Sequence, residues 1–306
     1  MMNNTTIDNI SSYMKKYIIM KDIFKLLSEN DISYAHIKGE ALSLQAYGKC
    51  GCRQYNDIDI LISRKDMSKT RILLSESGFN DHQKTLPKEI QIFIKSTSHQ
   101  LLPFSNKNKI IPLYVDLNFD IYWGEYNGSR VDISDFLSDT TEVNIYGCII
   151  KTLPPLKTFV QLALHHYKDL NSIFILATQS RIKQSMFQDI YYLLINNPET
   201  ISLENLYKFS VEHKIVPYVY YILYYTGLIY QNKVINDYIS AFKTLEGESL
   251  IDCYGLNESE RRKWKVDFNA RLASKNVFDL IKDDLLEKDI EKIAINKEVF
   301  LGDYYG

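Results

Sequence analysis

Two aspartates, Asp57 and Asp59, lie two residues apart in a stretch, 56–63, whose alternating polar and apolar residues predict a β-strand. Side chains two apart on a strand share one face, so the carboxylates would stand about 6.5–7 Å apart at their Cα atoms. Carboxylates held in this way repel each other, and a divalent cation that also binds substrate phosphates would relieve the repulsion. The pair therefore predicts a Mg²⁺ site for phosphate chemistry, the alternative being two ordinary acids on an exposed strand edge.

Groups that suit a phosphate precede this pair. Lys38 and Gly39 close a predicted strand, 33–37, and open a predicted helix, 40–47. A glycine at such a turn lets the backbone approach a ligand, and the N–H groups of a helix N-terminus bind phosphate. Arg53, in the loop before the aspartates, has the side chain that binds polyphosphates through two N–H groups at once. These residues predict a phosphate site beside the metal site.

A third carboxylate belongs to a later predicted strand. The apolar run 113–117, within a predicted strand at 110–119, is interrupted by one acid, Asp116. If this strand is adjacent to the first, Asp116 completes a set of three carboxylates able to hold two metal ions.

The run from Tyr34 to Ser63, YAHIKGEALSLQAYGKCGCRQYNDIDILIS, resembles a known family. It is similar to the bacterial uncharacterised nucleotidyltransferases, a group within the superfamily that shares its fold with DNA polymerase β. The residues that carry the resemblance are Lys38, Gly39, Ala41, Leu42, Tyr47, Arg53, Asp57 and Asp59.

The resemblance extends over roughly residues 20–195. The family's third acid corresponds to Asp116, and a helical segment of the family corresponds to the residues His165, His166, Arg181 and Asp189. Two positions depart from the pattern. Glu40 stands where the superfamily usually has a serine after the glycine, and Asn118 stands where the narrower group tends to have a histidine.

The resemblance implies an enzyme that moves a nucleoside monophosphate from an NTP to an acceptor and releases pyrophosphate. It implies two Mg²⁺ ions, or Mn²⁺ in their place, held by Asp57, Asp59 and Asp116. Lys38, the Gly39 amide and Arg53 would bind the phosphates of the NTP.

The helix expected at 156–169 would complete the nucleotide site. His165, which the resemblance includes, and Lys168, one helical turn from it, are the candidates for nucleotide binding. Because adjacent helical side chains point about 100° apart, only one of His165 and His166 is expected to face the cleft. Packing in the helical core is the alternative for both histidines.

The hydrophobic periodicity changes after Pro154-Pro155. Before this point strands and helices alternate, and after it nearly every segment has a helical period, which predicts an α+β chain. We expect a nucleotidyltransferase fold in residues 1–153, a small mixed sheet with flanking helices, followed by an all-helical acceptor-site or lid domain in residues 154–306. Helices are predicted at 7–29, 65–77, 181–196, 202–213, 216–230, 234–245 and 275–293, and strands at 99–104 and 142–153.

The composition excludes several other classes of protein. The 306 residues carry 36 Lys and Arg against 38 Asp and Glu, a net charge of −2 that argues against a whole-molecule nucleic-acid or membrane binder. Four cysteines are too few for a disulfide scaffold of this size, and the residues near 218–230 form an apolar stretch too short to cross a bilayer. We therefore expect a cytoplasmic protein with no membrane partner.

Several alternatives stay open on the sequence alone. We favour a small-molecule acceptor, and a tRNA or protein acceptor is the alternative. The only dense basic run, 261–265, is predicted to be a solvated helix face rather than an RNA site. A non-catalytic protein that keeps the fold to bind a nucleotide or a partner, such as an antitoxin or regulatory subunit, is the rival from another class. Glycosyl transfer from a nucleotide sugar is the third hypothesis.

Overall fold

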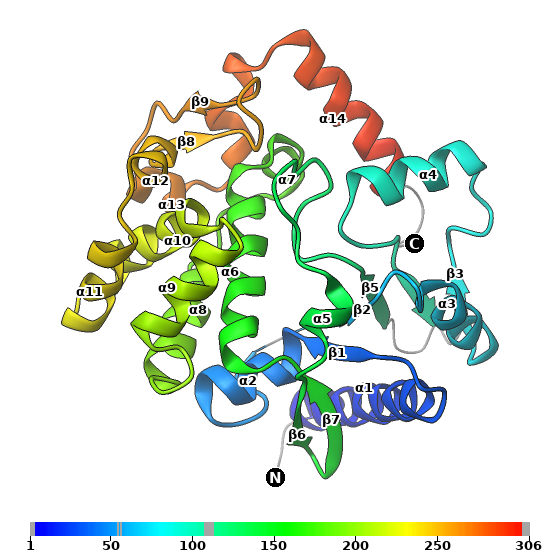
Figure 1. Ribbon diagram of the computed structural model, residues 1–306. Coiled ribbons are helices and arrows are strands. Elements are labelled where there is room, and N and C mark those ends of the chain that lie inside the picture. Colours follow the sequence, from blue (N-terminus) through cyan, green and yellow to red (C-terminus); the bar gives the residue numbers. More distant parts are fainter. Residues whose placement is uncertain (1–3, 54, 56, 107–112, 302–306) are drawn as a thin grey trace. The chain divides into compact units, whose positions relative to one another are not determined.

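The computed structural model describes residues 4–53, 55, 57–106 and 113–301, with side chains from Tyr17 onward (Figure 1). Its residues fall into two compact units. The first comprises the described residues of Met1–Leu44, Lys49–Asp120 and Asp132–Pro154, and the second comprises those of Gln45–Gly48, Ile121–Val131 and Pro155–Gly306. The domain boundary expected after residue 153 stays a prediction.

A seven-stranded mixed sheet forms the centre of the first unit, in the order β3-β4-β5-β2-β1-β7-β6. The pairs β2–β5 and β1–β7 are parallel, and the other neighbours are antiparallel. The strands are β1 (Tyr34–Ile37), β2 (Asp57–Ile62), β3 (Phe79–Asp81), β4 (Phe104–Asn106), β5 (Tyr114–Asn118), β6 (Thr141–Ile145) and β7 (Cys148–Thr152).

One face of this sheet is covered by helices. Phe24 and Leu27 of one helix and Leu74 of another pack in a single core with Ile58 and Ile60 of β2. Burying these side chains supplies the main favourable free energy of folding, and it leaves the opposite face of β2 to the polar residues of the strand. The helices of this unit are α1 (Asn4–Glu29), most of α2 (Gly39–Tyr47), α3 (Met67–Glu76), α4 (Lys88–Thr97) and α5 (Ile133–Phe136).

The second unit is built mainly from helices around α10. Nearly all side chains of α10 are apolar or aromatic, and a helix that is hydrophobic all round must be enclosed by others. It packs against α6, α8, α9, α11 and α12. The helices are α6 (Pro155–Asn171), α7 (Ile173–Thr178), α8 (Ser185–Asn196), α9 (Leu203–Glu212), α10 (Val216–Ile229), α11 (Lys233–Phe242), α12 (Leu245–Leu250), α13 (Phe268–Ala273) and α14 (Glu287–Phe300).

The α+β class is confirmed, with one addition to the expected helical half. Two short strands, β8 (Cys253–Tyr254) and β9 (Arg262–Lys263), pair there as a separate antiparallel sheet. The basic run 261–265 therefore lies on and beside a strand, and its expected helical conformation is wrong.

Two other expected elements differ from the structure. In the stretch 99–104, regular pairing begins only with β4, although Leu101 N–H donates to the Leu117 carbonyl at 3.0 Å. The helix expected at 275–293 is wrong over its first half, where two 3₁₀ turns, η1 (Val277–Leu280) and η2 (Lys282–Asp284), precede α14. The Asn276 side chain accepts from the Phe278 N–H at 3.2 Å, which favours a local turn over a continuous helix.

Within the part of the chain that the structure describes, every helix is too short or too polar to cross a membrane.

Candidate active site

Strands β2 and β5 bring three carboxylates to one face of the sheet. The parallel register pairs Asp59 directly with Asp116, and Asp57 precedes Asp59 by two residues on the same face. Ile58 and Ile60 point to the opposite face and are 1% and 0% exposed. Burial of the isoleucines in the core therefore determines that the aspartates gather on the other side.

The turn from β1 into α2 places a lysine at this carboxylate cluster. Ile37, the last residue of β1, pairs with Asp59. The next two residues, Lys38 and Gly39, have φ values of +58° and +46°, so the chain turns sharply before α2 begins. From this turn Lys38 reaches back, and its Nζ donates to Asp59 Oδ1 at 2.9 Å.

The crowded charges raise the pKa values of two of the acids. Burial, followed by the negative charges of Asp59 and Asp57, raises the pKa of Asp116 to about 8. Burial and the charge of Asp59 likewise raise the pKa of Asp57, while the positive charges of Lys38 and Arg53 act in the opposite direction. The negative charge of the three acids therefore exceeds the positive charge of the side chains around them. Arg53 lies near enough to lower the pKa of Asp57.

The carboxylate face fits a divalent metal ion. Asp116 Oδ1 is shielded from solvent and has no hydrogen-bond partner among the described residues. A buried carboxylate oxygen without a donor is costly, and it is the ligand that hard cations such as Mg²⁺ prefer. The donor set of Asp57, Asp59 and Asp116, all oxygen and all acidic, matches such a cation.

Two polar residues that sequence reasoning did not select complete this face. Gln100 Nε2 donates to Asp116 Oδ2 at 3.3 Å. Asn118 is 1% exposed, and its Nδ2 lies 3.4 Å from Asp59 Oδ1 and 3.2 Å from the Asp116 carbonyl oxygen. Asn118 could have been selected from its position two residues after Asp116 on the same strand face, whereas Gln100 has no comparable signal in the sequence.

Glu40 organises the loop that carries Arg53. Its side chain is fully buried and accepts from the Gly51 N–H at 2.7 Å and from the Tyr146 hydroxyl at 3.1 Å. The Cys52 N–H donates to Ser43 Oγ at 2.9 Å, so a second side chain of α2 holds the same loop. The glutamate that departs from the superfamily pattern therefore has a structural role in this chain.

The predicted residues of α6 form a cluster of their own in the second unit. His165 Nε2 and Lys168 Nζ each lie 3.1 Å from an oxygen of Asp169. Although burial alone would raise it, the positive charges of His165 and Lys168 hold the pKa of Asp169 well below its usual range. His166 is 6% exposed, which fits the packing role expected for one of the two histidines. The structure thus joins Lys38 to the three acids of the first unit, and His165 and Lys168 to Asp169.

Asp189, which the resemblance also selected, has a partner on α2. Its Oδ1 accepts from the Tyr47 hydroxyl at 2.6 Å, so two residues of the resemblance that are distant in sequence are in contact. The Asn196 side chain also donates to the Ala46 carbonyl at 2.7 Å, and so satisfies one of the orphan carbonyls at the end of α2.

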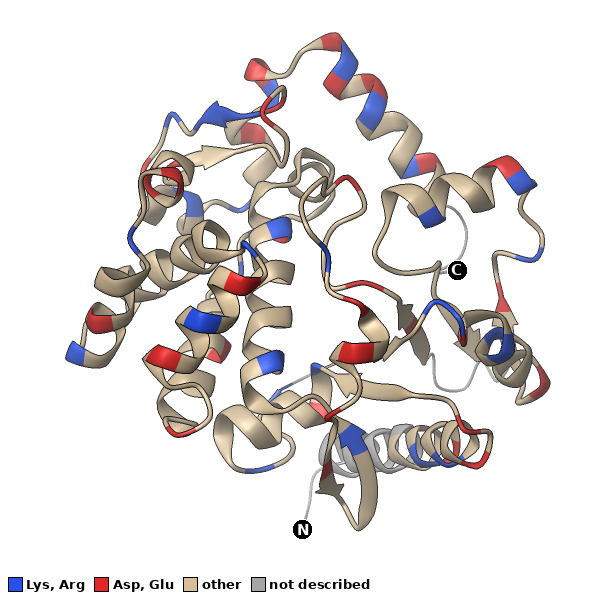
Figure 2. Ribbon diagram, viewed as in Figure 1, with Lys and Arg blue, Asp and Glu red and all other residues tan. Residues whose placement is uncertain are grey.

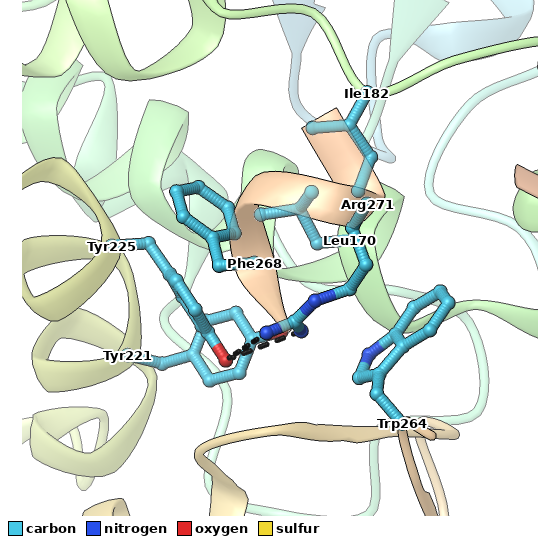
Figure 3. A pocket seen from close by; sticks show the side chains of 7 residues that line it. All are labelled: Leu170, Ile182, Tyr221, Tyr225, Trp264, Phe268 and Arg271. Carbon is cyan, nitrogen blue, oxygen red and sulfur yellow. Dashed lines mark hydrogen bonds between the residues drawn. The ribbon is translucent and has the colours of Figure 1, made fainter. Parts of the chain in front are cut away.

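A small cavity in the second unit is too small to be a substrate site (Figure 3). Its volume of about 10 Å³ is close to the minimum for a single water molecule. Arg271, which is 2% exposed, is one of the residues that line it. Arg271 pairs with Asp252 and donates to the Tyr225 hydroxyl at 3.3 Å. The cavity is lined by Leu170, Ile182, Tyr221, Tyr225, Trp264, Phe268 and Arg271.

Comparison with known proteins gives a match to a family model. The sequence model of a family described as "Uncharacterised nucleotidyltransferase" matches residues 2–231, well over half of the chain. Among curated proteins, none matches the sequence significantly.

Several solved structures are distantly similar. The antibiotic-resistance factor ANT(2'')-Ia matches with 9% identity and a TM-score of 0.40, covering 67% of this chain and 96% of that chain. The lincosamide antibiotic adenylyltransferase LnuA, solved with lincomycin, matches with 16% identity and a TM-score of 0.35, covering 58% of this chain and 94% of that chain. An antigenic nucleotidyltransferase-like protein from Paracoccidioides brasiliensis matches with 17% identity and a TM-score of 0.36, covering 65% of this chain and 88% of that chain.

Proposed function

Because the chain belongs to the family of uncharacterised nucleotidyltransferases, we propose that it transfers a nucleoside monophosphate from an NTP to an acceptor at the Asp57, Asp59 and Asp116 face. An oxygen of the acceptor attacks the α-phosphorus, and the bond from this phosphorus to the oxygen bridging to the β-phosphate breaks. Pyrophosphate leaves, and the hydroxyl proton passes to solvent. The observation that carries the proposal is the register of β2 and β5, which makes one oxygen-rich face from three acids.

The three aspartates would hold two divalent ions, Mg²⁺ or Mn²⁺. Bound metal would lower the pKa of the acceptor hydroxyl and neutralise charge on the triphosphate. Asp116 would lie nearest the acceptor, and Gln100 would fix the orientation of its carboxylate through the bond to Oδ2. Catalysis of this kind rests mainly on positioning and on neutralising charge.

The phosphates of the NTP would bind at the turn from β1 into α2. The first N–H groups of α2, beginning with Gly39, have no partner within the helix, and the helix dipole favours an anion there. Lys38 and Arg53 would add two positive charges, and the hydrogen bonds of Glu40 to the Gly51 loop would keep Arg53 in place. We also propose that His165 and Lys168 contact the nucleotide.

We favour a small-molecule acceptor over RNA. Two of the four basic residues in the run 261–265 are neutralised by acids, because Arg262 pairs with Asp289 and Lys265 pairs with Asp284. Figure 2 shows residues of both signs of charge interspersed along α14. The net charge of −2 points in the same direction.

The proposal is tested with purified protein, Mg²⁺, each of the four NTPs labelled at the α-phosphate, and a lysate of the source organism. Label should enter the small-molecule fraction with one NTP. It should be absent in Asp57→Ala, Asp59→Ala protein, and present in Glu89→Gln protein, which loses an exposed acid on α4. Label in RNA or protein would overturn the preferred acceptor class.

Binding measured beside this assay separates the rival functions. NTP binding with no transfer in any fraction would support the non-catalytic alternative. Transfer from a nucleotide sugar in place of an NTP would support the glycosyl-transfer alternative.

A further inference from the structure

Lys38 is hydrogen-bonded to one of the three acids that would hold a metal ion. Its Nζ lies 2.9 Å from Asp59 Oδ1, and the two side chains are 17% and 5% exposed. Asn118 Nδ2 lies 3.4 Å from the same oxygen. Two donors therefore already use this oxygen of Asp59.

The backbone explains why the ammonium group is held there. Lys38 has a left-handed φ of +58°, between the end of β1 and the start of α2. Its carbonyl oxygen accepts from the Leu42 N–H at 3.0 Å, in the first turn of α2. The backbone of Lys38 is therefore held between β1 on one side and α2 on the other. From this position the side chain reaches Asp59 with no movement of the backbone.

The ammonium group compensates part of the negative charge of this face. Its charge lowers the pKa values of both Asp57 and Asp116, against burial and the mutual repulsion of the acids. A divalent ion would supply the same compensation with twice the charge. An ammonium and a metal ion at one oxygen repel each other, so binding of the metal requires Lys38 to leave.

We propose that Lys38 is an internal counter-ion that competes with the metal until a nucleotide arrives. The triphosphate attracts the ammonium group away from Asp59, and the vacated oxygen then accepts the metal. Metal and nucleotide should therefore bind with positive coupling, each increasing the affinity for the other. This inference rests on the proposed function, because it takes the triphosphate to be the group that displaces the lysine.

The test measures Mn²⁺ affinity without any nucleotide, by electron paramagnetic resonance or calorimetry. Lys38→Met should bind Mn²⁺ about tenfold or more tightly than wild type, because the competing charge is gone. Lys38→Arg keeps the charge and should bind as weakly as wild type. Lys88→Met, which removes an exposed lysine from α4, should be unchanged.

A second measurement uses an NTP analogue that resists transfer. The analogue should raise the Mn²⁺ affinity of wild type more than that of Lys38→Met, whose metal site is already free of competition. Thermal unfolding establishes that each variant is folded, and Lys38→Gln replaces Lys38→Met if the latter is not.

The outcomes separate this inference from the proposed function. If folded Lys38→Met or Lys38→Gln binds Mn²⁺ no more tightly than wild type, while Asp59→Asn abolishes binding, the counter-ion role is wrong and the metal site stands. If wild type binds no Mn²⁺ with the analogue present, the metal site itself is wrong.

Discussion

At the scale of single residues, Asp116 shows a conflict between its proposed catalytic role and the stability of the protein. Burial and two neighbouring acids raise its pKa to about 8, so its ionised form is costly in the metal-free protein. Its Oδ1 has no hydrogen-bond partner among the described residues. Such a group is retained where a ligand needs it, and its removal should relieve the free energy that its charge costs.

Asp116→Asn should therefore inactivate the enzyme and stabilise the metal-free protein. We expect nucleotidyl transfer to fall about 10³-fold or more, and the free energy of unfolding in EDTA to rise on the order of 1 kcal/mol. Chemical denaturation with a transfer assay measures both. Asp120→Asn is the matched control, since Asp120 is a buried acid paired with Arg64 at 3.7 Å and its loss should lower stability. A lower melting temperature for Asp116→Asn would contradict the explanation.

Gly39 is required by its backbone and by its neighbour. Its φ is +46°, and an added Cβ would lie 3.2 Å from Cε1 of His36. Gly39→Ala should lower the free energy of unfolding by about 1–3 kcal/mol, measured in urea. Gly48→Ala separates the two causes, because Gly48 has a φ of +72° with nothing within 4 Å of an added Cβ. Equal effects of the two substitutions would show that His36 contributes nothing.

The sequence predicts the acids better than their surroundings. The alternation of β2 is visible because Ile58 and Ile60 must be buried, and this alone places Asp57 and Asp59 on one face. The contacts of Gln100 depend on how an irregular segment meets β5, which local periodicity does not contain. The residues that contact the acids are therefore harder to predict than the acids themselves.

At the scale of elements, the loop 49–53 depends on α2 for its conformation. The Gly51 and Cys52 N–H groups donate to side chains of Glu40 and Ser43. The Tyr146 hydroxyl, from the turn between β6 and β7, donates to the other oxygen of Glu40. A buried carboxylate with two donors thus joins a helix, a loop and a hairpin.

Glu40→Gln should release this loop, because an amide offers one acceptor oxygen where the carboxylate offers two. We expect the KM for the NTP to rise about tenfold with a smaller change in kcat, because Arg53 would bind phosphate less often. Hydrogen exchange at the Gly51 amide should speed up in the same variant. A change in kcat alone, with exchange at Gly51 unaltered, would contradict this positioning role.

Elements with strong periodicity and clear caps were predictable, and others were not. The helix expected at 234–245 is present as α11 but ends at Phe242, and Thr244, which accepts from the Gly247 N–H at 3.0 Å, caps the start of α12. Helix α4 was not expected, although its residues 88–97 follow Pro87, a helix-start signal. Strands β8 and β9 have two residues each, too short for any period to be visible.

At the scale of the whole molecule, each of the two units is built from several separate segments of the chain. The chain passes between them after residues 44, 48, 120, 131 and 154. Trp123, before the expected boundary at 153, packs its ring 5.4 Å from Tyr167 and 5.3 Å from Tyr218. A cut at this boundary would remove both of these tyrosines and leave Tyr126 as the ring neighbour of Trp123.

A fragment of residues 1–153 should therefore not fold as a stable domain. We expect broad thermal unfolding, and red-shifted emission from Trp123, the only tryptophan in the fragment. The full chain should unfold cooperatively. A fragment with a sharp transition and blue-shifted emission would show that residues 1–153 are an independent domain.

The parallel pairing of β2 with β5 has a consequence for how the molecule comes into being. Between the two strands the chain makes α3, β3, α4 and β4, so Asp59 and Asp116 meet only after a long loop has closed. A growing polypeptide leaving the ribosome lacks part of the proposed ligand set until residue 116 has emerged. Metal ions therefore cannot serve as a template for the early steps of folding, and tight binding of an ion would report that the sheet is already assembled.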